Sequence, residues 1–417
     1  MRKLWPILSV MNILIVFGCA TFNPRPIDEA LYRNRSLTKS DGEVRVTAAV
    51  LGAEETNKVF GFDLYKKGIQ PIWIEVENNT EGRLWFPHVG VDPNYFAPLE
   101  ISYLHHFSFS KNTNKQMDEY FHGQAMGPYV SPGKVRSGFV FTNLDLGTKG
   151  FNVDLIGEDH EIRTFTFFVA VPGLRVSHQD VEWKKLYSKD ELVSIDNEKD
   201  LRTAIEGLPC CTTNQGRTKQ GDPLNIVIIS SVKALHHALI RSGWDETESA
   251  KADSASKEKV LTTFARRSKH GPVTLQYVYG RPQDAAFRKS RETADERNQL
   301  RLWLSPIRYK GKPVWVGQIN RDIKVRFLPN TFQIEPFVDE VRTYMLQNLW
   351  YSQGLAKFGY LKGVGAASMS EPRKNMDGHS YFTDGYRLVM WVTSKFISFS
   401  EVEALQWGVP LATPSDY

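Results

Sequence analysis

Hydrophobic and polar positions alternate along much of the first half of the chain. The segments 44–50, 72–77, 138–141 and 164–171 carry apolar or β-branched residues at every second position or in short aromatic runs. Such patterns are typical of strands with one buried face, and polar turn residues separate them. We therefore predict an antiparallel β-sandwich of immunoglobulin-like architecture over residues 43–175.

The segment 103–137 interrupts this alternation. It mixes tyrosine, phenylalanine and histidine with lysine and asparagine, without a clear strand or helix period. We predict a long loop here. Because long loops in compact domains are uncommon unless they serve a function, this loop is a candidate binding segment.

The periodicity becomes mixed after about residue 175. We predict a partly ordered linker over residues 176–221, with one helix over 190–205. Beyond the linker the pattern predicts strands at 224–230, 273–279, 300–305, 313–319 and 386–392, and helices that begin after Ser231 and at Pro336. This order of elements predicts an α+β domain with a mixed sheet over residues 222–417. The expected fold class of the whole chain is α+β.

The N-terminus follows the pattern of an exported protein. Arg2 and Lys3 precede a short apolar run, and Val16–Cys19 resembles the lipobox of bacterial lipoproteins, with Phe17 where Ala or Ser is usual. The resemblance implies a signal peptide over 1–18, acyl chains such as palmitate on Cys19, and a tether over 19–42. Because no Asp follows the cysteine, it also implies the outer membrane of a Gram-negative cell, facing the periplasm. An ordinary signal peptide, or a core segment that includes a cysteine, remains the alternative.

Composition excludes two classes of protein. The 417 residues are 41% hydrophobic, and the N-terminal run is the one apolar stretch that could concern a membrane, so a polytopic membrane protein is excluded. The formal charge of +5 falls by two units if the signal peptide is removed. So small an excess on a chain of this length gives no electrostatic case for a nucleic-acid partner.

Several segments of the second half resemble, in order, the LssY C-terminal domain family. They are Gly-Asp-Pro-Leu-Asn-Ile-Val at 221–227, Gly-Arg-Pro-Gln-Asp-Ala-Ala-Phe-Arg-Lys at 280–289, Gln-Leu-Arg-Leu-Trp at 299–303, Pro-Val-Trp-Val-Gly at 313–317, Arg-Asp at 321–322 and Ile-Glu-Pro-Phe-Val-Asp-Glu-Val-Arg at 334–342. Related domains occur alone in envelope proteins and behind membrane phosphatases of the phosphatidic acid type. The Pro-Ser-Gly-His motif of those phosphatases is absent from this chain, so the resemblance does not imply phosphatase activity.

Charged and amide side chains gather at strand ends and in one helix of this region. The candidate ligand-binding residues are Arg281, Gln283, Asp284, Arg301, Arg321, Asp322, Asp339 and Arg342. Arginine forks beside carboxylates suit an anion or a small polar ligand. The alternative is that they form Arg–carboxylate pairs that hold loops against the helix.

Cysteine and histidine give weaker signals. The adjacent Cys210 and Cys211 permit a vicinal disulfide, a thiol pair or a structural turn. The histidines at 105–106 and 236–237 are also adjacent, and neighbours on a helix point about 100° apart. We therefore expect no metal site and no cofactor, and we expect His236 to pack near the apolar stripe of its helix.

The motif search leaves two functions open. No Gly-x-Ser-x-Gly elbow, phosphate-binding loop, dinucleotide fingerprint or metalloprotease helix occurs in the sequence. We expect a lipid-anchored envelope protein that acts as a binding or assembly module for an envelope protein or a lipid. The alternative is an enzyme, a hydrolase of lipid or cell-wall substrates that uses the Arg/Asp cluster.

Overall fold

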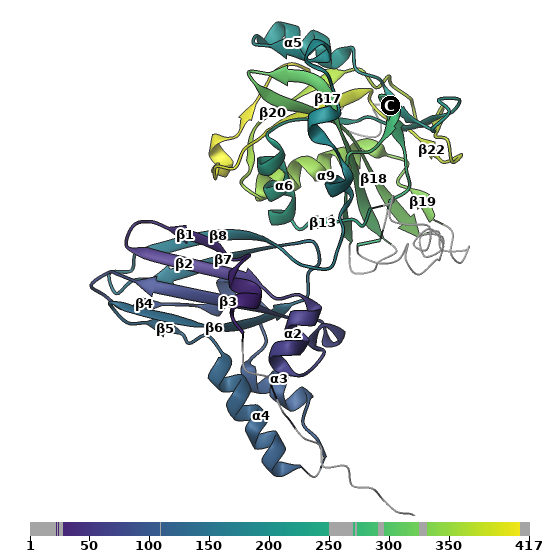
Figure 1. Cartoon of the computed structure of the whole chain (residues 1–417). Helices are drawn as coiled ribbons and strands as arrows, with labels where there is room; N and C mark the ends of the chain where they lie inside the picture. The colour runs from purple at the N-terminus through teal and green to yellow at the C-terminus, as the bar shows by residue number, and fades with distance from the viewer. Residues whose placement is uncertain are drawn as a thin grey trace, which may run out of the picture. The chain divides into compact units, whose positions relative to one another are not determined.

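The computed structural model describes residues 22, 24, 28–108, 110–249, 270, 271, 273–290, 296–324 and 332–408. The chain divides into two compact units, Met1–Leu144 with Asn152–Phe165 and Asp145–Phe151 with Thr166–Tyr417 (Figure 1). The predicted signal peptide and Cys19 lie outside the described residues. In the part of the chain that is described, no helix has the length and apolar character needed to cross a membrane.

The first unit is built on two antiparallel sheets of four strands. The first sheet is ordered β1 (Leu37–Ser40), β2 (Val44–Val50), β3 (Ile69–Asn78) and β6 (Lys134–Asn143). The second is ordered β5 (Tyr129–Val130), β4 (Leu84–Trp85), β7 (Thr148–Ile156) and β8 (Ile162–Ala170), and the boundary between the units runs through β7 and β8. The predicted antiparallel strands are confirmed, whereas the immunoglobulin-like arrangement stays a prediction.

Two segments of the first unit are more ordered than the sequence indicated. Part of the expected tether forms α1 (Ala30–Arg33) and β1, which pairs with β2 from Leu37↔Ala48 onward. The prediction of a loop at 103–137 is wrong, because this segment contains the whole of α4 (Lys111–Gln124) and the end of α3 (Pro98–Leu104). The helix α4 buries only Met117 and Phe121, so its apolar period is too sparse to stand out. A further helix, α2 (Ala53–Phe60), contributes Val59 and Phe60 to the same core.

The second unit contains a mixed ten-stranded sheet, as predicted. Its main path is β13 (Asp245–Glu246), β16 (Ala285–Ser290), β17 (Arg297–Tyr309), β18 (Lys312–Lys324), β12 (Ile226–Ile229), β23 (Tyr386–Val392), β20 (Leu355–Lys362) and β24 (Glu403–Ala404). Two strands pair at the side of this path, β19 (Phe332–Ile334) with β18 and β9 (Val193–Ile195) with β17. Smaller sheets are formed by β11 (Gln220–Pro223), β10 (Cys211–Thr213), β14 (Tyr277–Val278) and β15 (Arg281–Pro282), and by β21 (Arg373–Lys374) and β22 (Ser380–Tyr381). The α+β class is therefore confirmed.

Alternate residues of the central strands face opposite layers of the large sheet. Helices α6 (Val232–Arg241) and α9 (Val338–Tyr351) lie together in Figure 1 and pack on one face, where they meet Ile226 and Ile228 of β12. Helix α5 (Glu198–Glu206) packs on the other face against Val227 and Ile229. Each helix thus buries an apolar stripe on a strand that is buried on both sides.

Residues 176–221, which we expected as a partly ordered linker, contribute directly to this sheet and its cover. The strand β9 runs parallel to β17, and α5 follows it. Asn197 caps α5 by accepting a hydrogen bond from the backbone N–H of Asp200, so the helix begins later than the predicted 190–205. The strands predicted at 300–305 and 313–319 belong to β17 and β18, which a tight turn at Lys310 and Gly311 joins. These two residues have φ values of 46° and 73°, the left-handed geometry of a two-residue hairpin loop.

Candidate functional site

Three side chains of ligand type converge beside the large sheet. His178 lies on the short helix η3 (Ser177–Asp180), His236 on α6, and Glu246 on the edge strand β13. The hydroxyl of Ser231 caps α6, and Leu235 and Leu239 bury its apolar stripe. Anchored in this way, α6 places His236 at the side of the stripe, where it faces Glu246.

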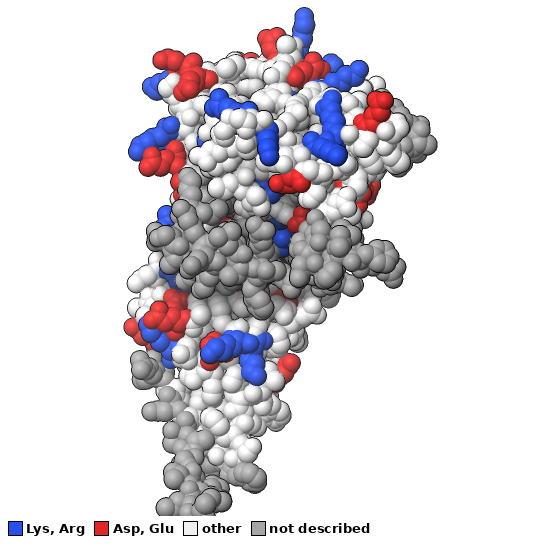
Figure 2. Space-filling view, turned by 90° about the vertical axis from the view of Figure 1, so that its right-hand side faces the viewer, with Lys and Arg blue, Asp and Glu red and all other residues white. Residues whose placement is uncertain are grey.

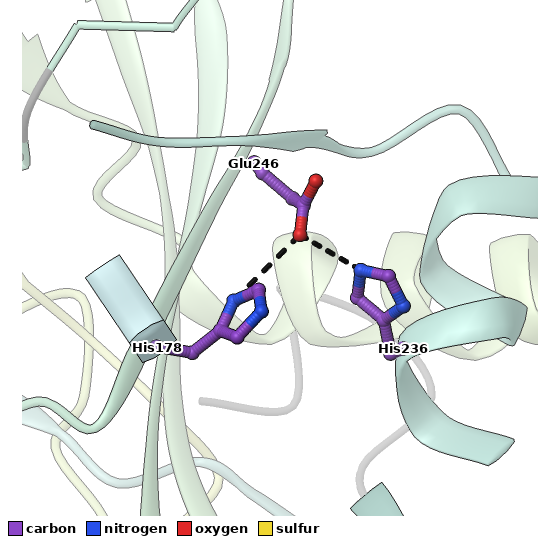
Figure 3. Close-up of side chains that lie close together, drawn as sticks. All are labelled: His178, His236 and Glu246. Atoms are coloured by element: carbon purple, nitrogen blue, oxygen red, sulfur yellow. Dashed lines mark hydrogen bonds and ion pairs between the residues drawn. The ribbon is translucent and has the colours of Figure 1, made fainter. Parts of the chain in front are cut away.

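The two imidazole rings approach the same oxygen of Glu246. Nε2 of His236 lies 2.8 Å from Glu246 Oε1, and Nδ1 of His178 lies 3.6 Å from it. Figure 3 shows the rings reaching this oxygen from two sides. The Glu246 side chain is 2% exposed, whereas those of His236 and His178 are 21% and 26% exposed. The carboxylate is therefore buried, and the histidines form its partly open side.

Burial and charge act in opposite directions on this group. Burial lowers the pKa of His178, and the Glu246 charge offsets part of that effect. Burial by itself raises the pKa of Glu246, but the hydrogen bond with His236 and the charges of both histidines bring the net pKa below its ordinary value. At neutral pH the site thus combines an ionised carboxylate with an imidazole that favours its neutral form.

An apolar pocket adjoins the histidines. It has a volume of about 260 Å³, and both His178 and His236 line it. Its apolar lining comes from η4 (Trp183–Lys185), α6 and three strands of the sheet, and consists of Trp183, Val232, Leu235, Ala285, Phe287, Leu302 and Trp315. Lys233 adds a cationic side chain. Pockets of this kind, with mostly apolar walls and a few polar groups, are typical of small-molecule sites.

A family model described as LssY C-terminus matches residues 202–386. The second half of this chain contains an LssY C-terminal domain. The resemblance inferred from the ordered segments is therefore confirmed over slightly less than half of the chain. No curated protein matches the chain. His236 and Glu246 lie inside the matched residues of the LssY C-terminal domain, whereas His178 precedes them.

The eight predicted ligand-binding residues of the LssY C-terminal domain do not form one site. Arg281 makes a bidentate pair with Asp284, with both N–O distances at 2.9 Å, and also donates to the Leu304 carbonyl. Gln283 instead accepts a hydrogen bond from the backbone N–H of Gln276. This first group fastens β15 to β17 through an Arg–carboxylate pair, whereas the alternative from the sequence had such pairs holding loops against the helix.

A second group lies across the paired strands β17 and β18. Arg301 donates to Gln318 and Gln299, and Gln299 in turn donates to Asp322, which also pairs with Arg297. Arg301 and Asp322 are thus brought together, through one amide side chain. The guanidinium of Arg321 lies on the opposite face, with Nε 2.9 Å from Asn298 Oδ1, because successive residues of a strand alternate in direction.

The third group joins α9 to the chain before β23. Arg342 makes a bidentate pair with Asp384, at 2.9 and 2.7 Å, and lies 3.3 Å from Asp339. Asp339 accepts hydrogen bonds from the Thr383 hydroxyl and from the backbone N–H of Asp384. Two of the predicted residues therefore meet here, but their partner Asp384 was not predicted.

The sequence analysis missed His178 and Glu246. Each is isolated in the sequence, and each comes from an element too short to show a period. His236 was named, but its expected packing role is incomplete because it faces a carboxylate. A pattern of separated His and Glu carries no local signal, since the sheet alone brings β13 next to the helix layer.

Cys210 and Cys211 are both free thiols. The hydrogen bond from the Cys211 thiol, together with one from Gln220, lowers the pKa of Cys210 to about 6, while the Cys210 contact and burial raise the pKa of Cys211. The sequence left open a vicinal disulfide, a thiol pair or a structural turn. The structure has a pair of thiols at the start of β10.

Proposed function

We propose that the protein is a lipid-anchored component of the cell envelope whose LssY C-terminal domain binds a small ligand with an apolar body. The observation that carries this proposal is the 260 Å³ pocket with apolar walls and two histidines at its side. Burying apolar ligand surface against such walls contributes about 25 cal/mol per Å² before the costs of binding. Positive and negative side chains are interspersed on the face in Figure 2, which favours a small ligand over a nucleic acid.

The arrangement of the Arg/Asp residues favours a binding module over the hydrolase alternative. A hydrolase built on them would need several of these groups aimed at one point. Instead, Arg281 is held by Asp284, and Arg342 is held by Asp384. None of the eight lines the apolar pocket. Their contacts support a structural role in connecting strands and helices.

Filling the pocket should weaken ligand binding. Val232 lines the pocket at the start of α6 and is 46% exposed, so Val232→Trp places an indole at the pocket with little added strain. We expect the affinity for 8-anilinonaphthalene-1-sulfonate, an aromatic anion, to fall at least about tenfold, or about 1.4 kcal/mol, in titration calorimetry. The matched control is Val193→Trp on β9, because Val193 is 48% exposed and lies outside the pocket lining. Equal affinities for wild type and both variants, or no binding by the wild type, would contradict the proposed pocket.

Changing the predicted lipidated cysteine should release the protein from membranes. Several acyl chains anchor a protein by about 0.8 kcal/mol per buried CH₂, and a Cys19→Ser chain has no thiol to carry them. We expect the variant in the soluble fraction, without incorporation of radiolabelled palmitate. Cys210→Ser is the control that should keep both membrane association and label. A Cys19→Ser protein that still fractionates with membranes would rule out this anchor.

A further inference from the structure

His178, His236 and Glu246 carry ligand atoms that their hydrogen bonds with one another do not fully satisfy. Of the two histidines, His236 is within hydrogen-bond distance of the carboxylate, whereas the His178 nitrogen lies 3.6 Å from Glu246 Oε1. The other oxygen, Oε2, is buried and has no partner with hydrogen-bond geometry among the described residues, although the nearby Thr148 side chain helps to lower the Glu246 pKa. A buried carboxylate oxygen without a hydrogen bond costs free energy unless another group satisfies it.

The spacing of the three ligand atoms suits a metal ion. One nitrogen from each histidine and one oxygen from Glu246 all lie within 4.8 Å of one another. In a tetrahedral zinc site the bonds are about 2.0–2.2 Å, which places two ligand atoms about 3.3 Å apart. The observed separations of 2.8 and 3.6 Å from Glu246 Oε1 lie on either side of that value. Small side-chain rotations therefore suffice to place an ion between the three groups.

We propose that His178, His236 and Glu246 bind one divalent transition-metal ion, with Zn²⁺ as the best match. Imidazole nitrogen favours zinc and its neighbours in the first transition series over Mg²⁺ and Ca²⁺, which prefer oxygen ligands. Within the described residues, no fourth histidine, cysteine or carboxylate joins the group. Two histidines, one glutamate and a free coordination position are the ligand set of an open zinc site.

The free position gives the ion access to the apolar pocket. Both histidines line that pocket, so an ion between them lies at its wall. Lys233 lines the same pocket and adds a positive charge. The ligand class that fits is an apolar body with a carboxylate or similar anionic donor that completes the coordination of the ion. This ligand class rests on the proposed function, whereas the metal site itself does not.

Metal binding is tested on the mature chain prepared without a histidine tag and stripped with a chelator. We expect one Zn²⁺ per chain in titration calorimetry, and with Co²⁺ an intense visible absorption typical of four-coordinate geometry. Glu246→Gln and His178→Ala should each lower the Zn²⁺ affinity at least about tenfold and abolish the intense Co²⁺ band. His237→Ala is the matched control, because His237 follows His236 on α6 but is absent from the ligand group.

Thermal unfolding separates loss of the site from loss of the fold. Without metal, Glu246→Gln should unfold cooperatively, and Zn²⁺ should raise the unfolding temperature of the wild type and of His237→Ala more than that of Glu246→Gln. If Glu246→Gln does not fold, His178→Ala decides, since its side chain is partly exposed. No Zn²⁺ binding by the wild type, equal affinity in all variants, or an equal loss in His237→Ala would overturn the metal site. Because no organic ligand is present, these results are independent of the pocket-filling experiment.

Discussion

Replacing Arg387 by methionine should lower the free energy of unfolding of the second unit, which contains the LssY C-terminal domain, by about 3–5 kcal/mol. Arg387 lies on the central strand β23 and is completely buried. Its guanidinium donates to five backbone carbonyls, those of Leu224, Ile205, Leu208, Pro209 and Gly363. Burial lowers the pKa of Arg387 to about 10, so the group is still charged at neutral pH. Methionine fills part of the space but leaves these carbonyls without their donor.

Urea unfolding followed by tryptophan fluorescence measures this loss. Lys395→Met is the control, because Lys395 is exposed and the same replacement there should change stability by less than about 0.5 kcal/mol. Arg387→Lys should recover only part of the loss, since an ammonium group cannot reach carbonyls spread around a planar fork. A loss below about 1 kcal/mol in Arg387→Met would show that the buried carbonyls find other partners.

Replacing Arg342 by methionine should destabilise the same domain by a similar amount, again about 3–5 kcal/mol. The Arg342 guanidinium is 3% exposed and is the cation between Asp339 and Asp384. Without it, two buried carboxyl groups of like charge remain close together. The loss should therefore be larger than that of an exposed ion pair, which contributes about 0–1 kcal/mol.

The destabilisation in Arg342→Met should depend on pH. Burial raises the pKa of Asp339 in the native protein, although Arg342 lowers it in part. Removing Arg342 raises this pKa further. A raised carboxyl pKa means that the folded state holds its proton more tightly than the unfolded state, so this contribution is present below about pH 4 and is lost as the pH rises through the folded value.

The comparison is made by urea unfolding at pH 5 and pH 8. Arg342→Met should lose more stability, relative to wild type, at pH 8 than at pH 5. The double variant Arg342→Met, Asp384→Asn removes one of the two unpaired charges and should recover part of the loss at pH 8. An equal loss at both pH values would mean that the carboxyl groups do not titrate between them.

Regular periods made much of the second unit predictable. The continuous apolar run at 224–230 predicted the strand that the structure forms as β12. Apolar residues at every fourth position after Pro336 predicted the helix that it forms as α9. The helix α4 escaped prediction because tertiary packing, through Met117 and Phe121, stabilises a mostly polar sequence. Helix propensity and hydrophobic periodicity therefore identify helices that bury a continuous apolar stripe. They miss a helix such as α4, which buries two residues.

Contacts in the candidate sites were predictable only at short range. Arg281 and Asp284 are three residues apart, and their pairing follows from local geometry. Arg342 and Asp384 come together because α9 packs against the sheet beside β23, and Glu246 meets His236 because β13 joins the sheet edge. A single sequence carries no signal for such long-range pairing, since topology decides it.

The position of β23 has a consequence for how the domain is made. This strand lies between β12 and β20, and it pairs in parallel with β12, which precedes it by about 160 residues. During synthesis the edge of β12 that pairs with β23 therefore stays unpaired until about 160 further residues have emerged. Pairing over such a separation folds slowly because a long loop must close first. Until then the half-formed sheet is the state most exposed to aggregation and to chaperones.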